Sequence, residues 1–323
     1  MKKLSIIIPM YNAEKYIVNC LNSIYESDLP KGEYEVIIIN DGSKDKGPEI
    51  AQDYVSKHEN FRYLTQENQG QSVARNYGIQ EARGEYLWCV DSDDMLVHDL
   101  NFIFDFLKKH PDADIVKTMI ETFHEGQATF YTQRDGSYIH KSGREMLLSG
   151  YHPQSLCNMI VRRSILIDNN LRLIPGIVSE DTEFSHKVYA FAKSVYTFNY
   201  ITYLYLYNPL STNNFKDKNR ILRGGMSDIT ISRSFCSFAK TLKETDPELS
   251  SLFYYRSNNI LLGQLLSMIR RRKERRGTGI NQTVLEEMKN KGVYPLKGKF
   301  DSIKKSLCAK FLNIEFILRK LIR

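Results

Sequence analysis

Short apolar runs recur along the first 119 residues of the chain, and amphipathic stretches at helical spacing separate them. The runs cover residues 4–8, 36–39, 61–64, 86–90 and 115–119. Continuous apolar runs, rather than alternating ones, are typical of strands that helices cover on both faces of a parallel sheet. The pattern therefore predicts an α/β fold, with a mainly parallel sheet sandwiched between helices.

The pattern changes beyond residue 119, where residues 120–160 show no clear period. Residues 180–192 are predicted to form a helix that begins with acidic side chains, and residues 195–207 are predicted to form strands. From about residue 214 the pattern is helical to the end, with a break at Gly277-Thr278-Gly279. We therefore predict an α/β domain over residues 1–212 and a helical, basic region over residues 213–323.

Polar residues gather where three of the apolar runs end. Pro9-Met10-Tyr11-Asn12 ends the first run, Asn40-Asp41-Gly42-Ser43 follows the second, and Asp91-Ser92-Asp93-Asp94 follows the fourth. The carboxyl ends of parallel strands meet at one edge of a sheet, and ligands bind beside that edge. We therefore expect these three segments to form one site.

The segment Asp91-Ser92-Asp93-Asp94 has the clearest chemical meaning. Three carboxylates within four residues repel one another unless a cation or hydrogen-bond donors neutralise them. Mg²⁺ or Mn²⁺, which prefer oxygen ligands, could do so and could also hold a diphosphate. An acidic solvent loop is the alternative, and the position directly after a buried strand favours the metal site.

Three other segments leave alternatives open. Asp41 could accept a hydrogen bond from N3–H of a uracil ring, or it could belong to an ordinary Asp-Gly turn. Glu180-Asp181 could provide a general base, or it could only favour the dipole of the helix that it begins. Arg75 could neutralise a phosphate, orient a carboxylate of the site, or form a surface ion pair.

Four ordered segments together resemble a known family. They are residues 6–14, 39–45, 68–78 and 90–94, and their order and spacing are similar to those of family 2 inverting glycosyltransferases, which have the Rossmann-like GT-A fold. The resemblance covers about residues 1–210, and Glu180-Asp181 falls where that family carries its base. It implies that residues 1–119 bind the nucleotide sugar and that residues 120–212 bind the acceptor.

The resemblance also implies roles for single residues in binding a UDP-sugar. Pro9, Tyr11 and Glu14 would line the nucleotide pocket, and Asp41 would bind the uracil ring. The expected activity is that of a hexosyltransferase, which adds the sugar to a glycan or lipid-linked saccharide during cell-surface polysaccharide synthesis.

Four further residues would carry the chemistry. Asp93 would hold Mn²⁺ or Mg²⁺ on the diphosphate, Asp91 would approach the ribose or the metal, and Arg75 would support that pocket. Asp181 would be the catalytic base, and a single base without an enzyme nucleophile gives inversion. Glu180 is adjacent and remains an alternative base.

Two rival functions are weighed against this one. A sugar nucleotidyltransferase would open with a Gly-rich loop and a lysine, whereas this chain has Pro9-Met10-Tyr11-Asn12. A degenerate relative that only binds glycans or scaffolds an assembly would have lost its carboxylates, which this chain retains. Cys157-Asn158-Met159 stands where many relatives carry Trp-x-Lys, and this departure falls in the acceptor half rather than the donor half.

Composition indicates the compartment. The five cysteines are odd in number and widely spread, which argues against a disulfide framework and a zinc site and favours a reducing cytoplasm. No run of eighteen apolar residues exists, so we expect no membrane span. The apolar run near the N-terminus is too short for a signal peptide.

Charge is distributed unevenly along the chain. Residues 256–323 contain 17 Lys and Arg but 5 Asp and Glu, a net charge of +12, whereas the rest of the chain carries −5. The apolar residues of one predicted helical face in this region are Ile303, Leu307, Phe311, Ile314, Leu318 and Leu321. An amphipathic basic helix can lie on an anionic membrane surface, or its apolar face can pack on the rest of the protein. We expect peripheral membrane contact and no nucleic acid, since no recognition motif accompanies the charge.

Overall fold

The structure is a computed structural model that describes residues 2–124, 136–207, 217–298 and 300–322. The chain forms two compact units, Met1–Gly176 with Glu180–Pro209 and Ile177–Ser179 with Leu210–Arg323. The boundary that the sequence predicts at residues 212 and 213 lies outside the described residues.

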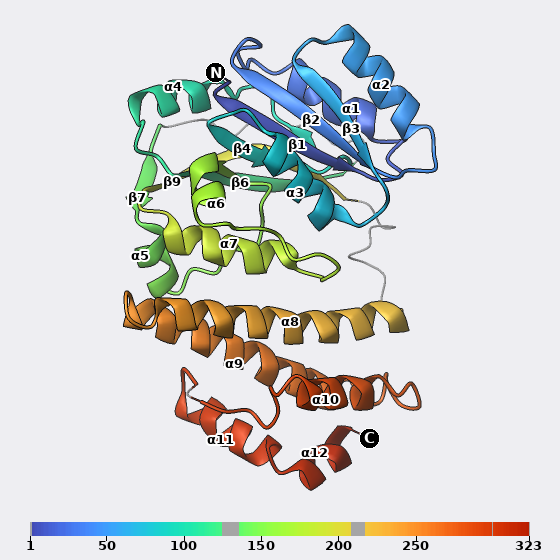
Figure 1. Cartoon of the computed structure of the whole chain (residues 1–323), viewed down its shortest axis with the longest axis vertical. Coiled ribbons are helices and arrows are strands. Elements are labelled where there is room, and N and C mark those ends of the chain that lie inside the picture. Colours follow the sequence, from blue (N-terminus) through green and yellow to red (C-terminus); the bar gives the residue numbers. More distant parts are fainter. Residues whose placement is uncertain (1, 125–135, 208–216, 299, 323) are drawn as a thin grey trace. The chain divides into compact units, whose positions relative to one another are not determined.

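A single mixed sheet forms the centre of the first unit (Figure 1). Its strands are β1 (Leu4–Met10), β2 (Tyr34–Asp41), β3 (Phe61–Gln66), β4 (Tyr86–Cys89), β5 (Met95–Leu96), β6 (Ile115–Phe123), β7 (Tyr138–Lys141), β8 (Met159–Arg162) and β9 (Val195–Leu206). The strand order is β3-β2-β1-β4-β8-β6-β9-β5, and β7 pairs with β9. Strands β3, β2, β1 and β4 are parallel, so the predicted parallel sheet is confirmed for the first four apolar runs.

The fifth apolar run is also a strand, but it does not pair with the fourth. Strand β8 lies between β4 and β6 and is antiparallel to both. Its four residues are too few to show a period, and they lie at the end of the segment for which the sequence shows no clear pattern. The predicted strand at residues 195–207 is confirmed as β9.

Helices cover both faces of the sheet, as the continuous apolar runs predict. They are α1 (Ile17–Tyr25), α2 (Gly47–Lys57), α3 (Gln71–Glu81), α4 (Asn101–Lys109), α5 (Gly143–Leu148), α6 (Arg163–Asp168) and α7 (Glu180–Phe191). Ile6 and Ile8 of β1 pack in one core cluster with α1. Ile7 points to the other face, where it meets Gly78 of α3. The carboxyl ends of β1, β2 and β4 therefore emerge between two layers of helices.

The second unit is helical, as its sequence predicts. Its helices are α8 (Lys218–Leu242), α9 (Pro247–Arg270), α10 (Ile280–Asn290), α11 (Ile303–Leu312) and α12 (Glu315–Ile322). Residues of α8, α9 and α10 share one core cluster, in which Leu265, Met268 and Val284 are fully buried. No helix in the described part of the chain combines the length and apolar character needed to cross a bilayer.

Two details of this unit differ from the sequence prediction. Helix α9 already ends at Arg270, and a turn over residues 271–279 precedes α10. The basic C-terminal stretch is two helices rather than one, because α11 ends before Asn313 and α12 begins at Glu315. The side chain of Asn313 accepts a hydrogen bond from the backbone N–H of Leu296 at 2.7 Å and donates one to its carbonyl at 2.8 Å.

Candidate active site

The loop after β1 is held against the loop after β2. The backbone N–H of Asn12 donates to Ser43 Oγ at 3.0 Å, and Glu14 Oε2 accepts from the backbone N–H of Lys46 at 3.0 Å. The side chain of Tyr11 is exposed between these contacts. Pro9 is a buried strand residue beside Ile39, near the end of β1. The structure therefore brings Pro9, Tyr11 and Glu14 to the carboxyl edge of the sheet.

Asp41 is buried at the end of β2, and both its carboxylate oxygens accept hydrogen bonds. Oδ1 accepts from Gln66 Nε2 at 2.7 Å and from the backbone N–H of Gln69 at 2.9 Å. Oδ2 accepts from the backbone N–H of Gly70 at 2.8 Å. A carboxylate oxygen has two lone pairs, so Oδ2 keeps one acceptor site. Asp41 thus shapes the loop after β3 and can still accept one further donor.

The Asp-Gly turn that the sequence suggests is also present. Gly42 has a φ of 70°, in the left-handed region that favours glycine. A Cβ atom there would lie 2.8 Å from the backbone nitrogen of Asn68. The turn and the ligand-binding interpretation of Asp41 are therefore compatible.

Arg75 is the buried centre of the second part of the site. Its Nη2 donates to Asp91 Oδ1 at 2.6 Å, and its Nη1 donates to Glu180 Oε1 at 2.8 Å. These bonds join the end of β4 to the first residue of α7. Arg75 and Glu180 are buried and Asp91 is partly buried, so the surface ion pair considered from the sequence is wrong. Two carboxylates and one guanidinium leave one net negative charge in this cluster.

Glu180 and Asp181 are adjacent, but their surroundings differ. Glu180 is buried and its Oε1 also accepts from Gln71 Nε2 at 2.5 Å, so two side-chain donors, Arg75 and Gln71, hold this oxygen in place. The carboxylate of Asp181 accepts from the backbone N–H of Thr182 at 2.8 Å, and no side chain of the described residues donates to it. Burial, and then the negative charge of Glu180, raise the pKa of Asp181 to about 6. A carboxylate with this pKa suits general-base chemistry near neutral pH.

The acidic segment after β4 is divided between two environments. Asp94 is buried and faces β9, where Tyr203 O–H donates to Oδ2 at 2.5 Å and the backbone N–H of Leu206 donates to Oδ1 at 2.9 Å. Burial, followed by the charge of Asp91, raises the pKa of Asp94 to about 8. Asp94 therefore ties the loop to β9, which leaves Asp91 and Asp93 as the carboxylates that face the site.

These two carboxylates fit a hard divalent cation. Asp91 Oδ2 accepts only the thiol of Cys157, at 3.6 Å, and Asp93 has no side-chain partner among the described residues. Burial and the charge of Asp91 raise the pKa of Asp93, which shows that negative charge there lacks compensation. No group of three or more His, Cys, Asp or Glu converges as a metal site within residues that the structure describes. Mg²⁺ is commonly held by one or two carboxylates plus substrate phosphates, and this donor set matches that mode.

The sequence did not identify three residues around this cluster. Tyr203 donates to Asp94 and accepts the backbone N–H of Asp91 at 3.1 Å, and Gln71 and Cys157 contact Glu180 and Asp91. The sequence predicts strands over residues 195–207, which are rich in tyrosine. Only the pairing of β9 with its neighbours determines which tyrosine faces the site.

Comparison with known proteins identifies the family to which the chain is similar. A family model described as "Glycosyl transferase family 2" matches residues 5–169, just over half of the chain. The chain is 28% identical over 332 residues to EpsH of Bacillus subtilis (strain 168), covering 97% of this chain and 93% of EpsH.

Two solved structures share the fold. S. aureus TarS in complex with UDP-GlcNAc matches with a TM-score of 0.60 and 21% identity, covering 90% of this chain and 93% of that chain. The mannosyltransferase PcManGT from Pyrobaculum calidifontis, in complex with GDP-Man and Mn²⁺, matches with a TM-score of 0.53 and 14% identity over 97% of this chain and 87% of that one.

Proposed function

Because this chain belongs to glycosyl transferase family 2 and is a glycosyltransferase, we propose that it is an inverting, metal-dependent enzyme that uses a UDP-sugar. The observation that carries the proposal is the contrast between Glu180, whose Oε1 accepts from Arg75 and Gln71, and Asp181, which has no side-chain donor among the described residues and whose pKa burial raises to about 6. The acceptor hydroxyl loses its proton to Asp181 while its oxygen attacks the anomeric carbon. The bond from that carbon to the diphosphate breaks, and UDP leaves from the opposite face, which inverts the configuration.

The nucleotide preference rests on Asp41. Its Oδ2 retains one acceptor site, and the N3–H of uracil is a donor of the right kind. The similar TarS structure contains UDP-GlcNAc, whereas the more distant PcManGT structure contains GDP-Man. The match to TarS has the higher TM-score of the two and supports uridine, and Asp41 would then accept uracil N3–H, with Pro9, Tyr11 and Glu14 lining the pocket.

The metal proposal rests on Asp93 and Asp91. When bound, Mn²⁺ or Mg²⁺ would be held by Asp93, with Asp91 beside it or on the ribose, and would supply Lewis-acid stabilisation to the leaving diphosphate. The chain itself contributes Arg75, which holds Asp91 in place and offsets part of its charge. The Mn²⁺ ion of the PcManGT complex supports this choice of metal.

The acceptor that we propose is a glycan or lipid-linked saccharide in cell-surface polysaccharide synthesis. Its support comes from relatives, including a teichoic acid poly(glycerol phosphate) polymerase of Staphylococcus epidermidis that is 27% identical over 267 residues, covering 80% of this chain and 35% of the relative. Residues 120–212 would bind this acceptor, where Cys157 replaces the more usual tryptophan.

We also propose that residues 256–323 bind an anionic membrane surface, which would place the enzyme at the cytoplasmic face. Large apolar side chains of α11 and α12 are exposed, with Ile303 81%, Leu307 61% and Phe316 78% accessible. Leu318, on the same predicted face, is fully buried in the core of the second unit. Only part of that face therefore packs internally, and the rest supports contact with lipid.

Paired substitutions test the proposed base. Asp181→Asn keeps the size of the side chain and removes its basicity, so transfer should fall by about 10²–10⁴-fold. Affinity for UDP with Mn²⁺, measured by calorimetry, should barely change because Asp181 does not contact the nucleotide. Glu180→Gln is the matched control and should be milder, since its Oε1 can still accept from Arg75. A near-normal rate in Asp181→Asn beside a collapsed rate in Glu180→Gln would move the base to Glu180.

A further inference from the structure

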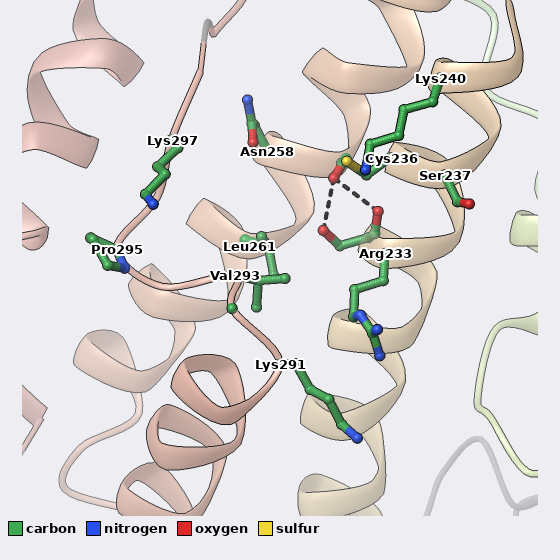
Figure 2. Close-up of a pocket in the computed structure, with 13 residues that line it drawn as sticks. Arg233, Cys236, Ser237, Lys240, Asn258, Leu261, Lys291, Val293, Pro295 and Lys297 are labelled. Carbon is green, nitrogen blue, oxygen red and sulfur yellow. Dashed lines mark hydrogen bonds between the residues drawn. The ribbon is translucent and has the colours of Figure 1, made fainter.

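The second unit contains a cavity of about 430 Å³ that is strongly basic (Figure 2). Helices α8 and α9 and the segment 291–297 form its wall, and the described lining residues include four cationic side chains but no acidic one. Small-molecule sites commonly occupy about 300–1,000 Å³, so this cavity has room for a small ligand. None of its lining residues belongs to the nucleotide site of the first unit.

The wall formed by α8 combines charge with small polar side chains. Arg233, Cys236, Ser237 and Lys240 line the cavity at positions i, i+3, i+4 and i+7 of one helix. Residues at this spacing lie on one helical face. Figure 2 shows Arg233 and Lys240 with Cys236 and Ser237 between them. Two cations about two turns apart thus flank a short stretch in which small side chains leave room.

The opposite wall is fixed by the core of the unit. In the segment 293–297, Tyr294 and Leu296 are buried in the core, while the odd-numbered residues line the cavity. Tyr294 O–H donates to the carbonyl of Leu312 at 2.8 Å, and Asn313 forms two hydrogen bonds with the backbone of Leu296. These contacts hold Lys297 on the cavity side, so the site exists before a ligand arrives.

The floor of the cavity is closed by two serines. The Oγ atoms of Ser232 and Ser257 are 2.8 Å apart, and Ser257 Oγ donates to the carbonyl of Ser232 at 2.9 Å. Dashed lines mark these bonds in Figure 2. These hydrogen bonds between Ser232 of α8 and Ser257 of α9 join the two helices beside the cavity.

The charge on the wall is largely uncompensated. Lys291 forms an ion pair with Glu287 at 3.5 Å. Arg233, Lys240 and Lys297 form no ion pair with any residue in the described ranges. Three cations that share one cavity repel one another, and an anion between them would relieve this repulsion. One guanidinium and two ammonium groups, from α8 and from the segment 291–297, suit a multi-oxygen anion such as phosphate better than a planar carboxylate.

We propose that this cavity binds a phosphate group, carried either by a soluble phosphate ester or by the headgroup of an anionic phospholipid. This site is additional to the donor site in the first unit, and its occupation requires neither sugar transfer nor a divalent metal.

The thiol of Cys236 provides a local probe. Cys236 lines the cavity and is a free, half-buried cysteine, as is Cys308 of α11, which does not line it. Alkylation by the neutral reagent iodoacetamide would be followed at each thiol by peptide mass spectrometry, in EDTA, with and without inorganic pyrophosphate or glycerol 3-phosphate. At a ligand concentration of about ten times Kd, labelling of Cys236 should slow by about tenfold, because only the empty fraction reacts. Labelling of Cys308 should not change.

Matched variants and vesicles complete the experiment. Arg233→Gln with Lys240→Gln should abolish protection of Cys236, whereas Arg83→Gln with Lys109→Gln, the same charge change at exposed residues of the first unit, should retain it. Protection by the soluble phosphates identifies a soluble ester as the ligand. Protection by phosphatidylglycerol vesicles, but not by phosphatidylcholine vesicles or the soluble phosphates, identifies a lipid headgroup.

Two outcomes would overturn the proposal. One is that neither the soluble phosphates nor the anionic vesicles slow the alkylation of Cys236 in the natural protein. The other is equal protection in the Arg233→Gln, Lys240→Gln variant, which would show that these cations do not hold the anion. UDP release measured on the same samples reports separately on the donor site, so failure here is distinguishable from failure of the proposed activity.

Discussion

A single buried guanidinium organises the charged residues of the site. Arg75 pairs with both Asp91 and Glu180, and this fixes the position of the Glu180 carboxylate beside Asp181. The sequence places Arg75 near the start of a predicted helix and is compatible with three roles for its side chain. The hydrogen bond from Arg75 to Glu180, which is 105 positions away in the chain, distinguishes between these roles. Contacts of that kind are set by tertiary packing, which spacing along the chain does not reveal.

The pH dependence of transfer should reflect Asp181. A general base must be deprotonated, and burial raises the pKa of this carboxyl to about 6. The rate should therefore be constant well above pH 6 and fall about tenfold per pH unit below it. Glu180→Gln removes the neighbouring negative charge, so the inflection should move to lower pH. A pH–rate profile from about pH 4.5 to 8 gives the inflection of the natural protein and that of Glu180→Gln. The same inflection in the two proteins would contradict the electrostatic coupling between Glu180 and Asp181.

Nucleotide preference should depend on Asp41. Its carboxylate holds the loop after β3 through Gln69 and Gly70, and in the proposed function it would also accept uracil N3–H. Asp41→Ala should weaken UDP binding by about 10–100-fold, since a hydrogen bond to a charged group contributes roughly 1.5–3 kcal/mol. Calorimetry with UDP, GDP and CDP provides the comparison. Equal affinity of the natural protein for all three diphosphates would refute the uridine assignment.

At the level of helices and strands, the strongest prediction concerns how closely α3 approaches the sheet. A Cβ atom at Gly78 would lie 2.4 Å from Ile7 Cγ2 and 2.8 Å from Ile39 Cδ1, so Gly78→Ala must displace α3 or the sheet. Overpacking of this kind typically costs about 1–3 kcal/mol of unfolding free energy. Helix α3 also carries Arg75, so UDP release should fall as well.

Gly263→Ala is the matched control. Gly263 lies within α9, and a Cβ atom there would meet nothing within 4 Å. Alanine favours a helix over glycine by about 1 kcal/mol, so this variant should be as stable as the natural protein or more stable. Urea unfolding followed by circular dichroism compares the two. Unchanged stability in Gly78→Ala would show that α3 does not contact the sheet as closely as the structure indicates.

The sheet also shows what the sequence could predict at this scale. Strands β1 to β4 were predicted because continuous apolar runs are typical of strands that helices cover on both faces. Strands β5 and β8 have two and four residues, too few for any period to appear. The tail was predicted as one helix, but the side chain of Asn313 bonds to the backbone of Leu296 instead of allowing the helix to continue.

For the whole molecule, the exposed apolar residues of α11 and α12 predict reversible membrane binding. The protein should co-sediment with phosphatidylglycerol vesicles at low salt and be released at high salt, which screens exposed charges. Ile303→Ser with Phe316→Ser should weaken this binding by about tenfold or more, at about 0.8 kcal/mol per buried methylene.

The control uses exposed apolar residues of the first unit. Tyr138→Ser with Ile139→Ser changes side chains that are 43% and 62% accessible in β7. These substitutions should leave vesicle binding unchanged. Equal loss in the two double variants, or no binding by the natural protein at low salt, would favour internal packing of the tail.

The central claim is that the chain is a metal-dependent glycosyltransferase with a UDP-sugar donor. Its most direct test is UDP release from a panel of UDP-, GDP- and CDP-sugars, with Mn²⁺ or with EDTA, for the natural protein and Asp93→Asn. We predict release from at least one UDP-sugar with Mn²⁺, loss of release in EDTA, recovery when Mn²⁺ is added back, and loss in Asp93→Asn. Full activity in EDTA, or release from GDP- or CDP-sugars alone, would contradict the account.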